Sequence, residues 1–306
     1  MANGLPLYKI SRDAFENNQA KSKGLNKGLL FERFFNGYSL DYSIGDRAKA
    51  EAIDAVAGVC GDEKAISSAS IKRITLIKHL NGQCKVFNTD WHFVTGMGNT
   101  HPTENGLSWH PTLGTPYLAG SSVKGLLRAW MTQYGSVSFD SWFGSEPDSK
   151  QTQAGDLIFF DAIPMLPPTL ACDIMTPHMG DWYAKGGEPA HNGDSTPGDW
   201  HNTIPIPFLV TKKAKLLFTI APRNPNDTNQ KIAAQQAIDE LVFALEFMGA
   251  GAKTSAGYGF MSEDAPALQG IIEDAATQKK QQENADKTPN QRSLGIIDDL
   301  LKEDVS

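Results

Sequence analysis

PYLAGSSVKGLLRAW, residues 116–130, joins a polar entry to an apolar repeat with helical spacing. The residues of the repeat are Val123, Leu126, Leu127 and Trp130. Apolar side chains three and four residues apart fall on one face of an α-helix, which can then pack on a sheet. Pro116 and Gly120 shape the entry, and Ser121 or Ser122 is expected to cap the helix. The stretch predicts a helix over about 121–134.

The start of this helix also has the chemistry of an anion site. The amides of a first helical turn have no acceptor within the helix, so they are available to an anion. Lys124 and Arg128 are four residues apart and share a face. We expect this end of the helix to hold a phosphate. A capped helix whose basic side chains are merely solvated explains the same residues.

A second segment, MGAGAKTSAGYGFM at residues 248–261, has related chemistry. Its first glycines free the backbone after a helix, and Gly257 and Gly259 stand where the chain enters a strand. Between them, Lys253, Thr254 and Ser255 offer a charge and two hydroxyls. A helix cap followed by a tight turn explains the first glycines but not this cluster. The segment therefore predicts a second phosphate cradle.

The order of the predicted elements favours an α+β fold. Two helices (46–60 and 67–82) are followed by a strand at 85–94, the helix at 121–134, a strand at 155–162, a strand at 212–220, a helix at 227–250 and a strand at 257–261. The run from residue 85 is β-α-β, a long insertion, and β-α-β, which is the ferredoxin-like (RRM-like) βαββαβ arrangement. We predict three regions: a mainly helical N-terminal extension (1–84), a ferredoxin-like domain (85–262, with the insertion 163–206) and an acidic, mostly flexible tail (263–306).

Composition bounds the class of protein. The 306 residues are 40% hydrophobic and 21% charged, without an apolar run long enough for a membrane span or the pattern of a secretory signal, so we expect a soluble, cytoplasmic protein. The cysteines, Cys60, Cys84 and Cys172, are far apart and favour neither disulfides nor a zinc site. Most of the net charge of −7 comes from the tail, which has ten acidic and five basic residues. The nearly neutral remainder is compatible with an anionic partner.

Two enzymatic motifs fit the residues poorly. A P-loop needs Gly before its lysine and opens a helix, whereas Ala252 precedes Lys253 and the chain runs from a helix into a strand. The run from Ser121 to Lys124 matches the Ser-x-x-Lys of penicillin-binding enzymes. No serine or tyrosine, however, has an asparagine two residues later, as that class requires. We therefore disfavour both a nucleotidase and a serine hydrolase.

The two glycine-bearing segments together resemble the paired signatures of the RAMP superfamily, the RNA-binding subunits of CRISPR type III effector complexes. Three further segments narrow the resemblance: TGMGNTHPTENGLSWHPTLG (95–114), DIMTPHMGDWYAKGG (173–187) and IPIPFL (204–209). They look like the type III-B, or Cmr, complex and its sixth-named subunit, which closes the filament near the 3′ end of the guide RNA. The resemblance covers about residues 71–262.

The resemblance implies a subunit that binds the crRNA backbone and helps to hold target RNA beside other RAMP subunits. Its implied RNA contacts are Gly120, Ser121, Ser122, Lys124, Arg128, Gly251, Lys253, Thr254 and Ser255. The insertion 163–206 corresponds to a thumb that family members push between segments of the guide–target duplex. Met179, Trp182 and Tyr183 are its candidate wedge or stacking residues, and burial against a neighbouring subunit is the other interpretation.

The resemblance also bears on catalysis. Ribonuclease activity in sibling subunits depends on an aspartate in the loop after the first strand, and the loop 95–115 has none. We predict a non-catalytic subunit without a metal, cofactor, membrane or small-molecule partner. The alternative is a metal-dependent endoribonuclease that uses His101, Glu104 and His110. Loop hydrogen bonds and subunit contacts are the more ordinary roles of these side chains.

Overall fold

A computed structural model describes residues 26–271, except 36, 40, 136, 138, 146–152, 179–181, 183–202 and 204. The chain divides into two compact units, Met1–Glu263 and Asp264–Ser306. The described start of the second unit is helical, and the Asp264 carboxylate accepts a hydrogen bond from the N–H of Ala267 at 3.2 Å. Among the described helices, none is long and apolar enough to cross a membrane. All further elements belong to the first unit.

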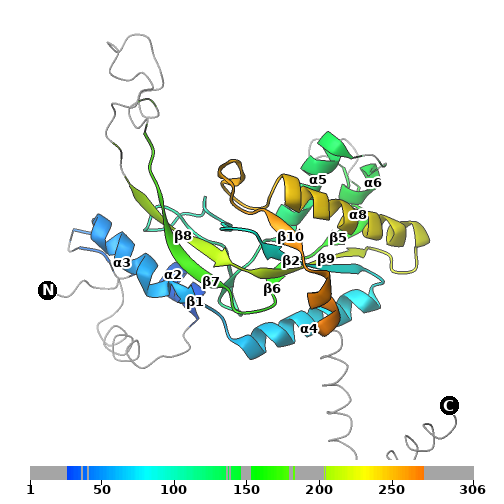
Figure 1. Ribbon diagram of the computed structural model, residues 1–306, viewed down its shortest axis with the longest axis horizontal. Coiled ribbons are helices and arrows are strands. Elements are labelled where there is room, and N and C mark those ends of the chain that lie inside the picture. Colours follow the sequence, from blue (N-terminus) through cyan, green and yellow to red (C-terminus); the bar gives the residue numbers. More distant parts are fainter. Residues whose placement is uncertain are drawn as a thin grey trace, which may run out of the picture. The chain divides into compact units, whose positions relative to one another are not determined.

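The central sheet is antiparallel throughout and mixes early and late parts of the chain (Figure 1). Its strands, in spatial order, are β10 (Met261–Glu263), β2 (Gln83–Thr89), β9 (Lys215–Pro222) and β5 (Leu157–Phe159), with β6 (Ile163–Pro164) also pairing with β9. Strands β2 and β9 pair over most of their length, with Gln83 opposite Ile220 and Asn88 opposite Lys215. The expected α+β fold is confirmed.

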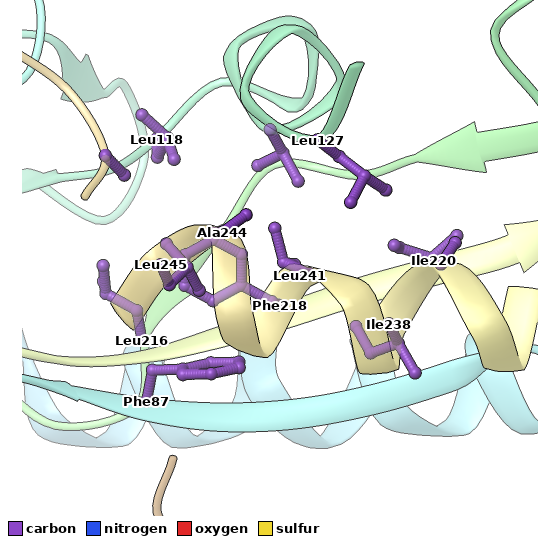
Figure 2. Close-up of a cluster of buried hydrophobic side chains, with 14 of the residues drawn as sticks. Phe87, Leu118, Leu127, Leu216, Phe218, Ile220, Ile238, Leu241, Ala244 and Leu245 are labelled. Atoms are coloured by element: carbon purple, nitrogen blue, oxygen red, sulfur yellow. The ribbon is translucent and has the colours of Figure 1, made fainter. Parts of the chain in front are cut away.

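Helices cover both faces of this sheet. Helices α5 (Gly120–Tyr134) and α8 (Thr228–Phe247) pack on one face, where Phe87, Phe218 and Leu241 meet in the core (Figure 2). Helix α4 (Glu63–His79) packs against β2, β6 and β9. The adjacent residues Val86 and Phe87 point to opposite faces of β2 and are both fully buried. Such a consecutive apolar pair is what a strand covered on both sides needs.

A second, smaller sheet carries the N-terminal helices. It consists of β1 (Gly58–Val59), β7 (Thr169–Met175) and β8 (Ile206–Lys213), and α2 (Lys27–Arg33) and α3 (Asp46–Val56) share a core with it. That core includes Phe31, Ile53, Leu170 and Leu209. The remaining elements are β3 (Trp109–His110), β4 (Thr115–Pro116), α6 (Asp140–Phe143) and a 3-10 turn, η1 (Thr254–Ala256).

The insertion predicted over 163–206 has regular structure at both of its ends. It contains β6 and β7, and β7 pairs antiparallel with β8, so both ends of the insertion are ordered. The strand expected over 212–220 is in fact the end of β8 and most of β9, which belong to different sheets. The chain changes sheet at Ala214, whose N–H bonds to the Thr89 hydroxyl at 3.0 Å. The sequence pattern does not reveal this change of sheet, because the apolar residues of β8 and β9 follow one another along the chain like those of a single buried strand.

Several boundaries also differ from the predicted ones. Helix α4 begins at Glu63 after Asp62, whose carboxylate accepts from the N–H of Ala65, so it starts earlier than the helix predicted over 67–82. The strand predicted over 85–94 ends at Thr89, and the one predicted over 257–261 begins only at Met261. The long helix predicted over 227–250 is confirmed as α8, and the Asp227 carboxylate caps it by accepting from the N–H groups of Asn229 and Gln230.

Candidate nucleic-acid interface

The two glycine-bearing segments meet in one groove of about 490 Å³, which we call the glycine-rich groove. It is lined by residues 95–98, by Leu118, by Ser122 and Leu126 of α5, and by residues 248–252 with Thr254 before β10. The lining carries no charged side chain. The tertiary fold therefore brings Ser122 together with Gly251 and Thr254, although about 130 positions separate Ser122 from the other two in the sequence.

The loop before β10 has the backbone of an anion cradle. Gly251 has φ +89°, and a Cβ there would collide with the carbonyl oxygen of Val94. Lys253 is also left-handed, with φ +61°, directly before the 3-10 turn. In the described part of the chain, the N–H groups of Lys253, Thr254 and Ser255 have no acceptor. Successive free amides around a left-handed residue form a concavity that suits a phosphate.

Lys253 lies at the rim of this loop rather than in the groove lining. Its Nζ is 5.4 Å from the ring centroid of Phe208 and 5.9 Å from that of Tyr258. Both distances are within the range of a cation–π contact. The ammonium group is thereby oriented toward β8.

Tyr258 in turn fixes the loop to β7. Its hydroxyl donates to Oδ2 of Asp173 at 2.6 Å, and His92 Nδ1 lies 3.2 Å from the same oxygen. Burial would raise the pKa of Asp173, but the hydrogen bonds from Tyr258, from the N–H of Ile174 and from His92 together lower it. Burial and the neighbouring carboxylate raise the pKa of Tyr258 to about 12. This contact thus pairs a neutral phenol with an ionised carboxylate.

The start of α5 differs from the prediction. The helix begins after Ala119, and neither serine makes a side-chain cap. Instead the N–H of Gly120 donates to Oδ1 of Asp161 at 2.7 Å. Gly120 is buried, and a Cβ there would collide with the Phe159 carbonyl. An internal carboxylate thus takes the amide of Gly120, and the expected role of Gly120 as an RNA contact stays a prediction.

The basic residues of α5 lie on a different flank from the groove. An α-helix turns by about 100° per residue, so Lys124 and Arg128 lie roughly 120° to 160° around the helix axis from Ser122 and Leu126. Both basic side chains are half-buried, and Ser121 is exposed beside them. We call Ser121, Lys124 and Arg128 the outer flank. Neither Lys124 nor Arg128 lines the glycine-rich groove.

The three residues of the nuclease alternative make internal contacts. His101 stacks on Phe31 with 3.8 Å between ring centroids, its Nε2 donates to the Phe31 carbonyl at 2.8 Å, and its Nδ1 accepts from the N–H of Thr103. Burial lowers the pKa of His101, and the smaller effect of the Phe31 carbonyl opposes it. Glu104 pairs with Lys49. His110 Nδ1 accepts from the N–H of Leu113 at 3.3 Å.

These residues do not converge on a common point. Among the described residues, no group of three or more histidine, cysteine or acidic side chains has the geometry to hold a metal ion. Of the thumb candidates, Met179 and Tyr183 lie outside the described residues, and Trp182 is half-buried. Their expected wedge role stays a prediction.

Reasoning from the sequence missed Asp161 and Asp173, which make the polar contacts that fix α5 and the loop before β10. Asp161 follows a short apolar run, and that position at the end of a strand is a weak signal for a contact with a neighbouring helix. Asp173 carries no such signal, because its partner Tyr258 is 85 residues away.

Comparison with known proteins identifies a family and several similar chains. A family model described as the RAMP superfamily matches residues 86–262. The CRISPR system Cmr subunit Cmr6 of Pyrococcus furiosus is 27% identical over 58% of this chain and 66% of its own length, slightly under two thirds. A chain in the cryo-EM structure of a type III-B Cmr-beta complex bound to cognate target RNA is similar over 82% of this chain and 85% of its own, with a TM-score of 0.51 and 19% identity. The crystal structure of Cmr6 from P. furiosus matches with a TM-score of 0.36 and 24% identity, over 60% of this chain and 98% of that one.

Proposed function

This chain belongs to the RAMP superfamily, and we propose that it is an RNA-binding, non-catalytic subunit of a type III-B CRISPR (Cmr) effector complex. In this role it binds the crRNA backbone, caps the filament near the 3′ end of the crRNA and helps to recognise target RNA. The similarity to Cmr6 and to a chain of a Cmr-beta complex bound to target RNA supports the proposal. Its partners would be crRNA, target RNA and other RAMP subunits.

The strand order supports a ferredoxin-like core. In chain order the core reads β2, α5, β5, β9, α8 and β10. Numbered along the chain, these four strands lie in the order fourth, first, third, second, and every pair is antiparallel. A split pair of βαβ units has this order. The described boundaries also favour treating the α4 helix as part of the core layer rather than as a separate extension, since α4 packs on β2 and β9.

The single observation that carries the RNA-binding proposal is the glycine-rich groove. It combines exposed backbone, the Ser122 and Thr254 side chains and the free amides beside Lys253, without any acidic side chain. Such a site accepts phosphates and sugar hydroxyls but offers no set of groups to distinguish bases. A subunit that leaves sequence recognition to guide–target pairing needs this chemistry.

The proposal divides the predicted contacts into two sets. Ser122, Gly251, Lys253, Thr254 and Ser255 hold RNA at the groove and its rim. The outer flank holds a neighbouring stretch of backbone on the other side of α5, because helix geometry separates it from the groove. Each set then contributes its own phosphate contacts, which can be tested separately.

The non-catalytic role is favoured over the endoribonuclease by the contacts of its three candidate residues. His101 uses both ring nitrogens inside the protein, and Glu104 is paired with Lys49. A nuclease would need them to share a metal or a water molecule. Met179, Trp182 and Tyr183 are proposed as wedge or stacking residues of the insertion, whose base is the β7–β8 ribbon.

Alanine substitution in the assembled, guide-loaded complex tests the proposal. One variant replaces Ser122, Lys253 and Thr254, a second replaces Lys124 and Arg128, and the control replaces Lys64 and Lys72, which are exposed on α4. We expect retention of crRNA to weaken in the first two variants. The slope of log K against log salt should flatten by about 0.7 for each phosphate that the variant no longer neutralises, as for single strands. Slopes equal to the control in both variants would contradict the proposal.

Cleavage of labelled target RNA tests the catalytic part. Replacement of His101 and His110 by alanine in the complex should leave every cut in place. Loss of one specific cut, with the complex still assembled, would favour the endoribonuclease.

A further inference from the structure

A second hollow, of about 430 Å³, lies where the two sheets meet, and we call it the basic pocket. Three segments line it: residues 88–92 at the end of β2 and beyond, 166–169 at the start of β7, and 212–215 at the junction of β8 and β9. None of these residues belongs to the glycine-rich groove or to the outer flank. The volume is within the range of pockets that take a small ligand or one unit of a polymer.

The charges of the pocket favour an anion. Lys212, Lys213 and Lys215 line it, and the only acidic residue in the lining is Asp90. Asp90 accepts a hydrogen bond from the Ser262 hydroxyl at 2.6 Å. In the described part of the chain, neither Lys212 nor Lys213 forms an ion pair, and both are exposed. Their positive charge is therefore available to a ligand.

The exposed aromatic and apolar side chains of the pocket favour a nucleobase as part of its ligand. Trp91 is 48% exposed although it is large and apolar. Its ring stacks on His92, with 4.4 Å between centroids and 13° between planes, so it is held in one orientation. Leu166, which is 51% exposed, and Pro167 add apolar surface. A rigid, partly exposed indole beside lysines is the combination with which proteins bind unpaired nucleotides.

Trp91 also connects the pocket to the loop before β10. Its ring centroid is 4.8 Å from that of Tyr258, over which Lys253 lies. The N–H of Gly259 donates to the His92 carbonyl at 2.7 Å, which ties the two segments by their backbones. A strand that leaves the glycine-rich groove past Lys253 therefore meets Trp91 next.

We propose that the basic pocket binds an unpaired nucleotide of the RNA, with its base stacked on Trp91 and the adjoining phosphates on Lys212 and Lys213. This proposal rests on the proposed function, since the same RNA would occupy the groove. An acidic peptide of a neighbouring subunit would satisfy the lysines but would leave the exposed indole without a stacking partner. The combination of charge and ring therefore favours RNA.

Photocrosslinking separates this proposal from the proposed function. The guide-loaded complex is assembled with RNA that contains 4-thiouridine, irradiated, and its crosslinks are mapped on this chain. We expect crosslinks at Trp91 as well as at residues 251–258. Crosslinks at 251–258 but none at 88–92 or 212–215 would overturn the proposal that the basic pocket binds a nucleotide. They would leave the proposed function standing. The absence of crosslinks from both regions would overturn both.

Binding of labelled oligouridine to the full chain supplies the quantitative test. Trp91→Ala should weaken binding by about 5- to 100-fold, the usual effect of removing one stacked base, and Trp91→Phe should restore most of it. Replacement of Lys212 and Lys213 by alanine should flatten the salt slope by about 1.4, whereas the Lys64 and Lys72 control should not change it. An unchanged affinity and slope in both pocket variants would overturn the proposal.

The competing occupant gives a different result. If the pocket receives an acidic peptide, the Lys212 and Lys213 variant fails to join the complex while its affinity for oligouridine stays at the wild-type value. That result would also overturn the proposal. A melting temperature close to that of the wild type shows that each variant is folded.

Discussion

The N–H of Gly120 donates to the Asp161 carboxylate at 2.7 Å, which connects the start of α5 to the chain between β5 and β6. The backbone carbonyl of Asp161 also accepts a hydrogen bond from Arg73 of α4 at 2.8 Å. One residue thus contacts helices of both outer layers. A carboxylate at this position also complements the positive end of the helix dipole.

Removal of this carboxylate should destabilise the protein. Asp161→Asn keeps an acceptor but loses the charge, and we expect a loss of about 0.5–1 kcal/mol. Asp161→Ala loses the cap as well, and should cost about 1–2 kcal/mol. Urea denaturation of the full chain measures both. Equal stability of Asp161→Ala and the wild type would contradict the capping role.

Tyr258→Phe should weaken the attachment of the loop before β10 to β7. Because the Tyr258 hydroxyl helps to lower the pKa of Asp173 in the folded state, its stabilising effect is present above the usual pKa of aspartate and disappears as the pH falls through the lowered value. The difference in unfolding free energy should be about 1–2 kcal/mol near pH 6. Urea denaturation at a series of pH values should show the difference shrinking below about pH 4. A constant difference down to pH 2 would argue against an ionised Asp173 at this contact.

His101 should make stability sensitive to mild acid. Burial lowers the pKa of His101 in the folded state, so the unfolded chain binds the proton first as the pH falls. The buried neutral imidazole makes its full contribution to the free energy of unfolding above about pH 6.5, and this contribution is lost as the pH falls below that value. His101→Gln cannot be protonated, and its melting temperature should fall less between pH 7 and pH 5 than that of the wild type. Parallel pH profiles would contradict the buried neutral imidazole.

Gly251→Ala should disturb the loop that lines the glycine-rich groove. The residue has φ +89°, and its new Cβ would meet the Val94 carbonyl. We expect a loss of about 2 kcal/mol or more in stability, together with weaker crRNA retention. Gly125→Ala is the matched control, because a Cβ at this helical glycine meets nothing within 4 Å. It should stabilise the helix slightly.

The sequence alone determined the central helices and the residue types of the candidate site. The apolar repeat of α5 and the long helix α8 rest on local patterns, and local geometry is enough to predict them. The glycines around Lys253 indicated backbone freedom for the same reason, since access to positive φ is a property of single residues. The motifs also sufficed for the RAMP resemblance, which the family match bears out.

Only the tertiary structure decided how these pieces combine. The carboxylate of Asp161 at Gly120, the switch between sheets at Ala214 and the contact of Tyr258 with Asp173 join residues that are far apart in the chain. The position of Ser122 in the groove and of Lys124 outside it follows from which face of α5 the sheet buries. Long-range contacts of this kind depend on the packing of whole layers. No periodicity in a single segment encodes them.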